Sequence, residues 1–413
     1  MASYSDVNKH FCEEDFVLRT TEGHAYHLES VTDHERATLY GVQARCPLNE
    51  LDYFDVTQGF PPDVMHDILE GVMPLVVKLV LREAREEKHI TLHEFNDKLK
   101  HMCFGKNDTQ NRPVPITENH LRKSIVGSAS QKWCLFRVLP MLMAHQIPPG
   151  SAYWNVYLLS REIVEIILAS QFRRNDLVNL KMLIEEFLTE MSNVFGNVLT
   201  PKCHYLLHYP RLILMYGPLR YLWCMRYESK HQYFKELAKA SKNLLNVTHS
   251  LCTRHQFKQC WEFSSSLMCA FERSNSKSVS TPFSTLPVDL QNTLKGHCAF
   301  KDVQFEGKRL QRVSELFVNN VKYALEDVFV IAQVHAEEIP LFWKVKYIIN
   351  LDTCWVLCGK ILIPLCFDSH VHAYKAKLDP HWTLINPGDE VDFHALDMYS
   401  VDGSMYVPMK YFV

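Results

Sequence analysis

Two histidines four residues apart have the types and spacing of metal ligands. They are His204 and His208, in the segment PKCHYLLHYPRLILMYGPLRYLWCMRYESKH (201–231). On a helix, residues i and i+4 project from one face, so the two imidazoles could supply half of a tetrahedral zinc site. The bare spacing alone favours a simpler interpretation, two polar residues on an amphipathic surface. A zinc protease is excluded, because the Glu of H-E-x-x-H is absent.

An acidic residue in a basic segment follows twenty positions later. The segment 226–242 holds five Arg or Lys residues and two Glu, one of which is Glu228. A carboxylate beside cations suits a site where a divalent metal meets a phosphate backbone. The cations proposed to contact DNA phosphates are Lys230, Lys235, Lys239 and Lys242. The alternative is a solvated helix face opposite an apolar stripe formed by Tyr227, Phe234, Leu237 and Leu244.

A second cluster of polar residues follows two prolines. Asp63, His66, Asp67 and Glu70 are spaced i, i+3, i+4 and i+7, which on a helix could bind a cation. Capping is the favoured interpretation, because Asp is a preferred N-cap residue and acids in a first turn are stabilised by the helix dipole. No functional role is assigned to Asp63, His66 or Asp67 from the sequence.

Several function classes are excluded by what the sequence lacks. It has no phosphate-binding Gly-rich loop, no G-x-S-x-G elbow and no dinucleotide fingerprint. Its formal charge of −3 excludes a general polycation, so any DNA contact must come from a local patch. The thirteen cysteines include no C-x-x-C pair and are expected to be reduced thiols of a soluble intracellular protein. No apolar stretch long enough to span a membrane is present, so no membrane partner is expected.

The hydrophobic pattern predicts a mainly α protein with a C-terminal β domain. The segment from Asp63 to Leu81 has helical spacing, with Pro74 as an expected kink. Period-two alternation begins near residue 299 and predicts a small β-rich domain, on whose strands His370 and His372 are expected to face solvent. The expected divisions are 1–60, a helical domain 61–200, a helical segment 201–272, a linker 273–298 and the β domain 299–413.

The segments FPPDVMHDILEGV (60–72) and PKCHYLLHYPRLILMYGPLRYLWCMRYESKHQYFK (201–235) resemble the transposases of CACTA (En/Spm-like) DNA transposons. The resemblance extends in order over residues 1 to 270. It implies an RNase H-like catalytic core of the DDE type, interrupted by a large helical insertion, with 1–60 a remnant of that core and of the zinc-region flank. It also implies that His204 and His208 complete a zinc site with a C-x2-C pair. Glu228 would then be the third acid that binds two Mg²⁺ or Mn²⁺ ions.

One departure from the family pattern bears on activity. The family's C-x2-C pair and first two catalytic aspartates precede the segment that matches Met1 onward. One remaining Glu cannot hold two metal ions, so the chain as given is expected to be inactive, with an incomplete zinc site and no productively bound metal. The leading hypothesis is a transposase-derived protein with residual DNA binding and nuclear residence.

Two alternatives stay open. One is a non-catalytic scaffold whose β domain binds a protein partner through exposed aromatics such as Trp343, Trp355 or Trp382. The other is an active transposase whose N-terminal part is missing from the gene model.

Overall fold

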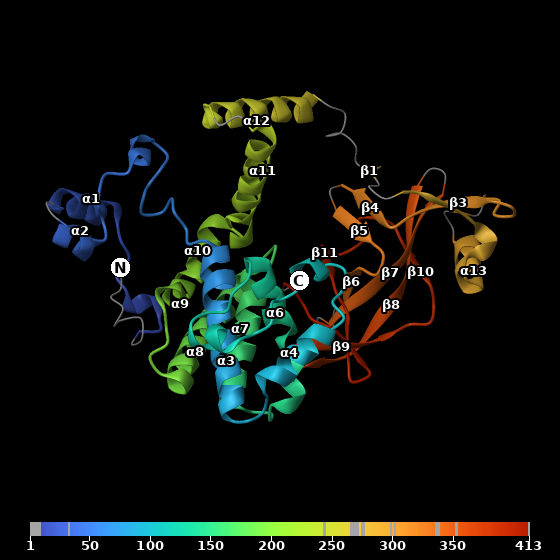
Figure 1. The fold of residues 1–413 in the computed structure, drawn as a ribbon, viewed down its shortest axis with the longest axis horizontal. Coiled ribbons are helices and arrows are strands. Elements are labelled where there is room, and N and C mark those ends of the chain that lie inside the picture. The colour runs from blue at the N-terminus through green and yellow to red at the C-terminus, as the bar shows by residue number, and fades with distance from the viewer. Residues whose placement is uncertain are drawn as a thin grey trace.

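The chain is helical in its N-terminal part and forms antiparallel sheet in its C-terminal part (Figure 1). This computed structural model describes residues 10–31, 34–242, 245–264, 272–273, 277–297, 300, 303–319, 321–334, 339–351 and 354–411. The expectation of a mainly α protein with a C-terminal β part is therefore confirmed at that level. Within the described part of the chain, every helix is too short or too polar to traverse a lipid bilayer.

The helices are mostly short and their starts follow the sequence. Capping boxes at Thr91, Thr117 and Ser128 begin α4, α5 and α6, because each side chain accepts the third backbone N–H of its helix. The bounds are α1 Thr21–Ser30, α2 His34–Tyr40, α3 Met73–Glu86, α4 Leu92–His101, α5 Glu118–Arg122, α6 Ala129–Met143, α7 Ala152–Ile167, α8 Arg174–Phe195, α9 Pro201–Tyr205, α10 Tyr209–Tyr216, α11 Met225–Ser241, α12 Val247–Ser264 and α13 Val288–Gly296.

The helix expected from Asp63 starts with π-helical winding. Met65–Val72 forms the π-helix η3, which runs directly into α3. Met73 donates its N–H to the carbonyl of Ile68, five residues back. Pro74 has no N–H, so the winding changes where one helical donor is missing in any case.

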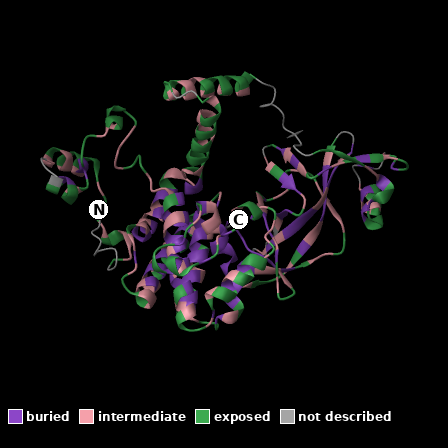
Figure 2. Cartoon of the chain, in the orientation of Figure 1, coloured by how far each residue is buried: buried purple, intermediate pink, exposed green. Residues whose placement is uncertain are grey.

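The helical core is completed by residues from the C-terminal strands. One cluster of buried side chains joins η3, α3, α6, α7 and α8 to Tyr399, Tyr406 and Tyr411. The helical body is defined here as η3 and α3–α10 with their connections. Figure 2 shows buried residues concentrated in the helical body and the sheet, whereas α11 and α12 are coloured as exposed or intermediate. The helical body and the sheet therefore form one packed unit.

A large antiparallel sheet makes up most of the C-terminal part. Its path is β11-β6-β7-β8-β9-β13-β12, with β3 also paired to β7, β2 to β3 and β10 to β8; a smaller sheet has the order β1-β4-β5. The bounds are β1 Glu272–Arg273, β2 Val279–Pro282, β3 Arg309–Val313, β4 Glu315–Val318, β5 Val321–Ala324, β6 Val328–Val334, β7 Ile339–Leu351, β8 Cys354–Asp368, β9 Ala373–Leu378, β10 Thr383–Ile385, β11 Asp392–Leu396, β12 Tyr399–Val401 and β13 Ser404–Val407.

Buried polar contacts fasten the sheet to the helical body. Asp108 forms an ion pair with Arg137 of α6 at 2.5 Å and accepts a hydrogen bond from the hydroxyl of Tyr399. Trp154 Nε1 of α7 donates to the carbonyl of His370 at 3.0 Å. Because Tyr399 and Trp154 have their hydrogen-bond partners across the contact, separating the two parts would expose these polar groups and the shared apolar core together.

Three expectations differ from the structure. The described part of 1–60 forms helices, and the described residues before Glu272 include no strand, so an RNase H-like core is not confirmed. The expected linker 273–298 contains β2 and α13, because Phe283, Leu290 and Leu294 bury their side chains in a cluster beneath the sheet. His372 is buried instead of facing solvent, because it lies in the turn between β8 and β9 against the helical body.

Candidate functional site

The two segments that resemble a transposase meet in space at Asp63. The backbone N–H of Cys224 donates to Asp63 Oδ1 at 2.9 Å, and its Sγ donates to Oδ2 at 3.0 Å. His66 Nδ1 lies 2.6 Å from the same Oδ2. Asp63, His66 and Cys224 thus form one group of three side chains, from the start of η3 and the residue preceding α11.

Asp63 also caps η3, as expected from the sequence. Its carboxylate accepts the backbone N–H of His66 at 3.2 Å. Burial alone would raise the pKa of Asp63, but hydrogen bonds from Cys224 and His66 outweigh it, and the pKa is lowered. The ionised side chain of Asp63 therefore both accepts a backbone N–H of η3 and contacts Cys224, the residue before α11.

Glu228 lies one helical turn after Cys224 and reaches the same group. Its Oε1 is 3.8 Å from His66 Nε2, and 56% of its side chain is exposed. His66 therefore lies between two carboxylates, with Asp63 at Nδ1 and Glu228 at Nε2. Both ring nitrogens of His66 therefore have a carboxylate nearby, at 2.6 Å for Asp63 and 3.8 Å for Glu228.

Asp67 points the opposite way from His66 and is buried. It accepts a hydrogen bond from the hydroxyl of Tyr209 at 3.2 Å, and burial raises its pKa to about 6. On the outer side, Lys202 Nζ donates to the backbone carbonyl of His66 at 2.6 Å. A Cβ at Gly71 would lie 2.4 Å from Lys202 Cδ, so the glycine makes room for this lysine.

His204 and His208 face each other with their Nε2 atoms 3.2 Å apart. Two nitrogen ligands of a tetrahedral zinc ion are separated by a similar distance, about 3.3 Å at ordinary zinc–nitrogen bond lengths. His208 Nδ1 is held by Glu13 Oε1 at 2.8 Å, and burial lowers the pKa of His204 to about 4. In the described ranges, neither histidine belongs to a group of three potential ligands, so this pair offers half of a zinc site.

The basic segment forms a projecting arm. The arm is defined here as α11 and α12, residues 225–264, and Figure 1 shows α11 rising from the helical body with α12 across its end. Lys235, Lys239 and Lys242 are exposed, and Lys230 lies over the ring of Tyr233 at 5.0 Å. Neither helix has a buried residue among those described. Of the expected apolar stripe, Tyr227 is 69% exposed, Phe234 and Leu237 are partly buried, and Leu244 lies outside the described residues.

The donor atoms decide which metals suit these groups. Carboxylate, imidazole and thiol donors, as in Asp63, His66 and Cys224, are those that zinc accepts. A pair of Mg²⁺ or Mn²⁺ ions needs several carboxylates. The described part of the chain contains two groups of potential metal ligands, Asp63–His66–Cys224 and Cys12–Glu14–Glu185, and Glu228 belongs to neither. The residues around Glu228 therefore do not fit a two-metal centre.

Comparisons with family models, curated proteins and solved structures found no match. The geometry alone identifies the residues that the sequence did not single out, namely Cys224, Lys202 and Tyr209. Cys224 lies four positions before Glu228, but its partner Asp63 is 161 positions away. Local spacing carries no signal for such a contact.

Proposed function

We propose that this chain is a transposase-derived DNA-binding protein, in which the arm contacts phosphates and the region around Glu228 no longer performs strand transfer. The proposal includes the relationship to RNase H-like transposases and the nuclear residence implied by the resemblance. The observation that carries it is the arm, a basic two-helix projection whose described residues are all exposed or partly exposed.

The charge of the arm suits a polyanion. Residues 225–264 contain seven Lys or Arg and three Glu, a net charge of +4 in a chain whose total is −3. Concentrating positive charge on one projection in this way favours contact with phosphates there and disfavours it elsewhere. Helices that bury no side chain gain little from packing, so a ligand that covers them also stabilises them.

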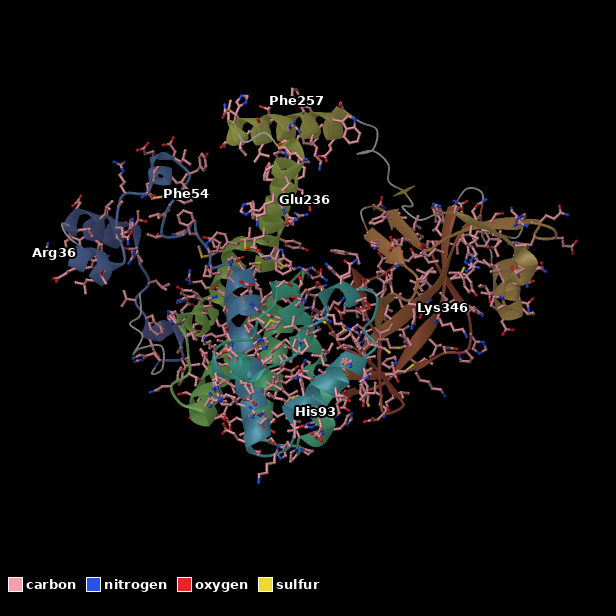
Figure 3. All side chains as sticks on the ribbon, viewed as in Figure 1. Arg36, Phe54, His93, Glu236, Phe257 and Lys346 are labelled. Carbon is pink, nitrogen blue, oxygen red and sulfur yellow. The ribbon has the colours of Figure 1, made fainter. Side chains whose placement is uncertain are left out.

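Aromatic side chains accompany the cations on the arm. Phe257, Trp261 and Phe263 of α12 are 70%, 59% and 73% exposed, and Figure 3 shows Phe257 at the end of the arm farthest from the helical body. Lys258 lies 4.5 Å from the ring of Tyr233. Basic residues that track a backbone beside rings on which bases stack are the usual features of single-strand binding.

The region around Glu228 supports DNA binding without strand transfer. Glu228 Oε1 lies 3.8 Å from His66 Nε2, and Asp63 contacts Cys224 and His66. An active transposase would need further carboxylates close to Glu228. A longer chain that supplied them would be the active enzyme of the alternative hypothesis.

The scaffold hypothesis has weaker support. Trp343 is 1% exposed, and Trp382 is partly buried against Tyr347, with ring centroids 5.6 Å apart. Trp355 also packs against the core of the sheet. Of the three tryptophans, Trp343 is therefore buried within the sheet, and Trp355 and Trp382 are only partly exposed.

The test is a salt titration of DNA affinity. The quadruple variant K230E/K235E/K239E/K242E and a matched control, K88E/K98E/K100E/K123E on the helical body, are compared with the parent by fluorescence anisotropy on single- and double-stranded oligonucleotides. Each lost phosphate contact lowers the slope of log K against log salt by about 0.7 to 0.9. We expect the slope for the arm variant to fall by the equivalent of at least two phosphate contacts and the slope for the control to stay unchanged. Equal binding by parent and arm variant at every salt concentration would refute the assignment.

A further inference from the structure

A cavity of about 600 Å³ lies between the helical body and the sheet, away from the arm and from Asp63. Its helical wall comes from α7 and the start of α8, and its opposite wall includes His372, Tyr374 and Tyr411. Its volume is within the range of small-molecule sites, about 300 to 1,000 Å³.

A neutralised carboxylate forms part of the lining. Glu165 accepts from Arg161 Nη2 at 2.5 Å and lies 3.3 Å from His372 Nε2. Burial alone would raise its pKa, but His372 and Arg161 overcome that effect and lower it. Glu165 is therefore ionised and already compensated by groups of the protein.

A second carboxylate in the cavity is only partly compensated. Glu162 lies nearly one turn before Glu165 on α7 and is accessible to solvent. Among the described residues, no cationic side chain forms an ion pair with it. Burial and the neighbouring Glu165 and Glu186 raise its pKa, whereas His372 and Asn179 act in the opposite direction. A ligand cation would remove this unbalanced charge.

Aromatic rings and acids together define the character of the cavity. Phe172, Phe367, Tyr374 and Tyr411 supply ring surface, and Phe367 and Tyr374 pack with centroids 5.0 Å apart. Three carboxylates line the cavity against one guanidinium, that of Arg173 at the start of α8. Ring faces and an unpaired carboxylate are the surroundings that bind amines and quaternary ammonium groups.

We propose that this cavity binds a small organic cation, with Glu162 as its counter-ion and the aromatic rings around its apolar body. Arg161 and His372 already contact Glu165, a carboxylate of the protein, so they are not free to bind a ligand anion.

The test uses the full chain and two probes of matched shape. Choline carries the positive charge and 3,3-dimethylbutan-1-ol is its neutral isostere; acetate serves as the opposite charge. Binding is measured by saturation-transfer NMR and by calorimetry on the parent, on E162Q and on E186Q. E162Q removes the charge while keeping the shape, and E186Q removes a neighbouring charge that does not line the cavity.

We expect choline to bind at least about tenfold more tightly than its isostere. We expect E162Q to weaken choline binding by about tenfold, with E186Q changing it less than about twofold. Equal affinity for choline and the isostere, tighter binding of acetate, or an unchanged affinity in E162Q that retains the parent melting temperature would each overturn the proposal. These readouts do not involve DNA, so they are independent of the proposed function.

Discussion

Replacing Asp108 by Asn tests whether one buried carboxylate, which pairs with Arg137 of α6 and accepts a hydrogen bond from Tyr399 of β12, helps to hold the sheet on the helical body. Asp108 and Arg137 are 3% and 5% exposed and lie 2.5 Å apart, and Tyr399 of β12 donates to the same carboxylate. Burial would raise the pKa of Asp108, but Arg137 and Lys410 hold it well below its usual value. The carboxylate is therefore ionised at neutral pH, and D108N leaves Arg137 as a buried charge without its counter-ion.

The expected loss of unfolding free energy is large because Arg137 would remain a buried charge without its counter-ion. Removing one partner of a buried pair costs about 3 to 5 kcal/mol, compared with about 1 kcal/mol for losing a neutral hydrogen bond. Arg137 has little alternative, since its Nε and Nη1 atoms already lack hydrogen-bond partners. With a urea dependence of about 3 kcal/mol per molar, a loss of about 3 kcal/mol moves the unfolding midpoint by about 1 M.

The assay is urea unfolding followed by tryptophan fluorescence and circular dichroism. Y399F removes the hydroxyl and keeps the ion pair, so its midpoint is expected to shift by about a third as much. D97N removes an exposed acid whose pair with His101 is 61% and 68% accessible, and it is expected to change nothing measurable. A D108N midpoint within about 0.2 M of the parent would refute the reasoning. The pKa of Asp108 is lower in the native state than in the unfolded state. Its ion pair therefore stabilises the fold at pH values above the unfolded pKa, and this stabilisation is lost as the pH falls through the native pKa.

Three further predictions concern the region around Asp63. The pKa of Asp67 is raised to about 6, so its ionised carboxylate destabilises the fold at pH 7.5, and this effect disappears as the pH falls toward 4. D67N is therefore expected to raise the melting temperature at pH 7.5 and not at pH 4.5. Gly71→Val is expected to displace Lys202 and to lower the free energy of unfolding by about 1 kcal/mol, measured by urea unfolding against Gly296→Val, whose Cβ meets no atom within 4 Å and whose φ is not positive. Burial and Asp63 raise the pKa of the Cys224 thiol to about 12. D63N is therefore expected to speed the alkylation of Cys224 by iodoacetamide at pH 8, with the rate measured by mass spectrometry. An unchanged rate would contradict the contact between Asp63 and Cys224.

Periodicity predicted the class of structure where apolar spacing was regular. The pattern from Asp63 to Leu81 became η3 and α3, and the alternating C-terminal segments became strands of the large sheet. The π-helical winding was not predictable, because the apolar spacing within a segment of eight residues does not distinguish π from α winding. The expected linker was misjudged, since its Ser, Thr and Pro content obscured Leu286, Leu290 and Leu294, which are spaced four apart and buried.

The sequence singled out Asp63, His66 and Glu228 of the candidate site, but neither Cys224 nor the contacts among these residues. Asp63 was expected to cap a helix, and it does so. Its contact with Cys224 and the approach of His66 to Glu228 depend on how distant helices pack. His372 was expected to face solvent because alternating residues indicate a strand, whereas the turn between β8 and β9 carries it against Glu165.

The shared core also determines the order in which the chain can reach its final state during synthesis. The helical body comes first along the chain, yet its cluster of buried residues includes Tyr399, Tyr406 and Tyr411. A chain emerging from its N-terminus therefore keeps one flank of the body uncovered until the β region has been synthesised. Exposed apolar flanks of this kind recruit chaperones and promote aggregation. A stop codon just before Tyr399 would thus leave an aggregation-prone protein, and not merely one that lacks β12 and β13.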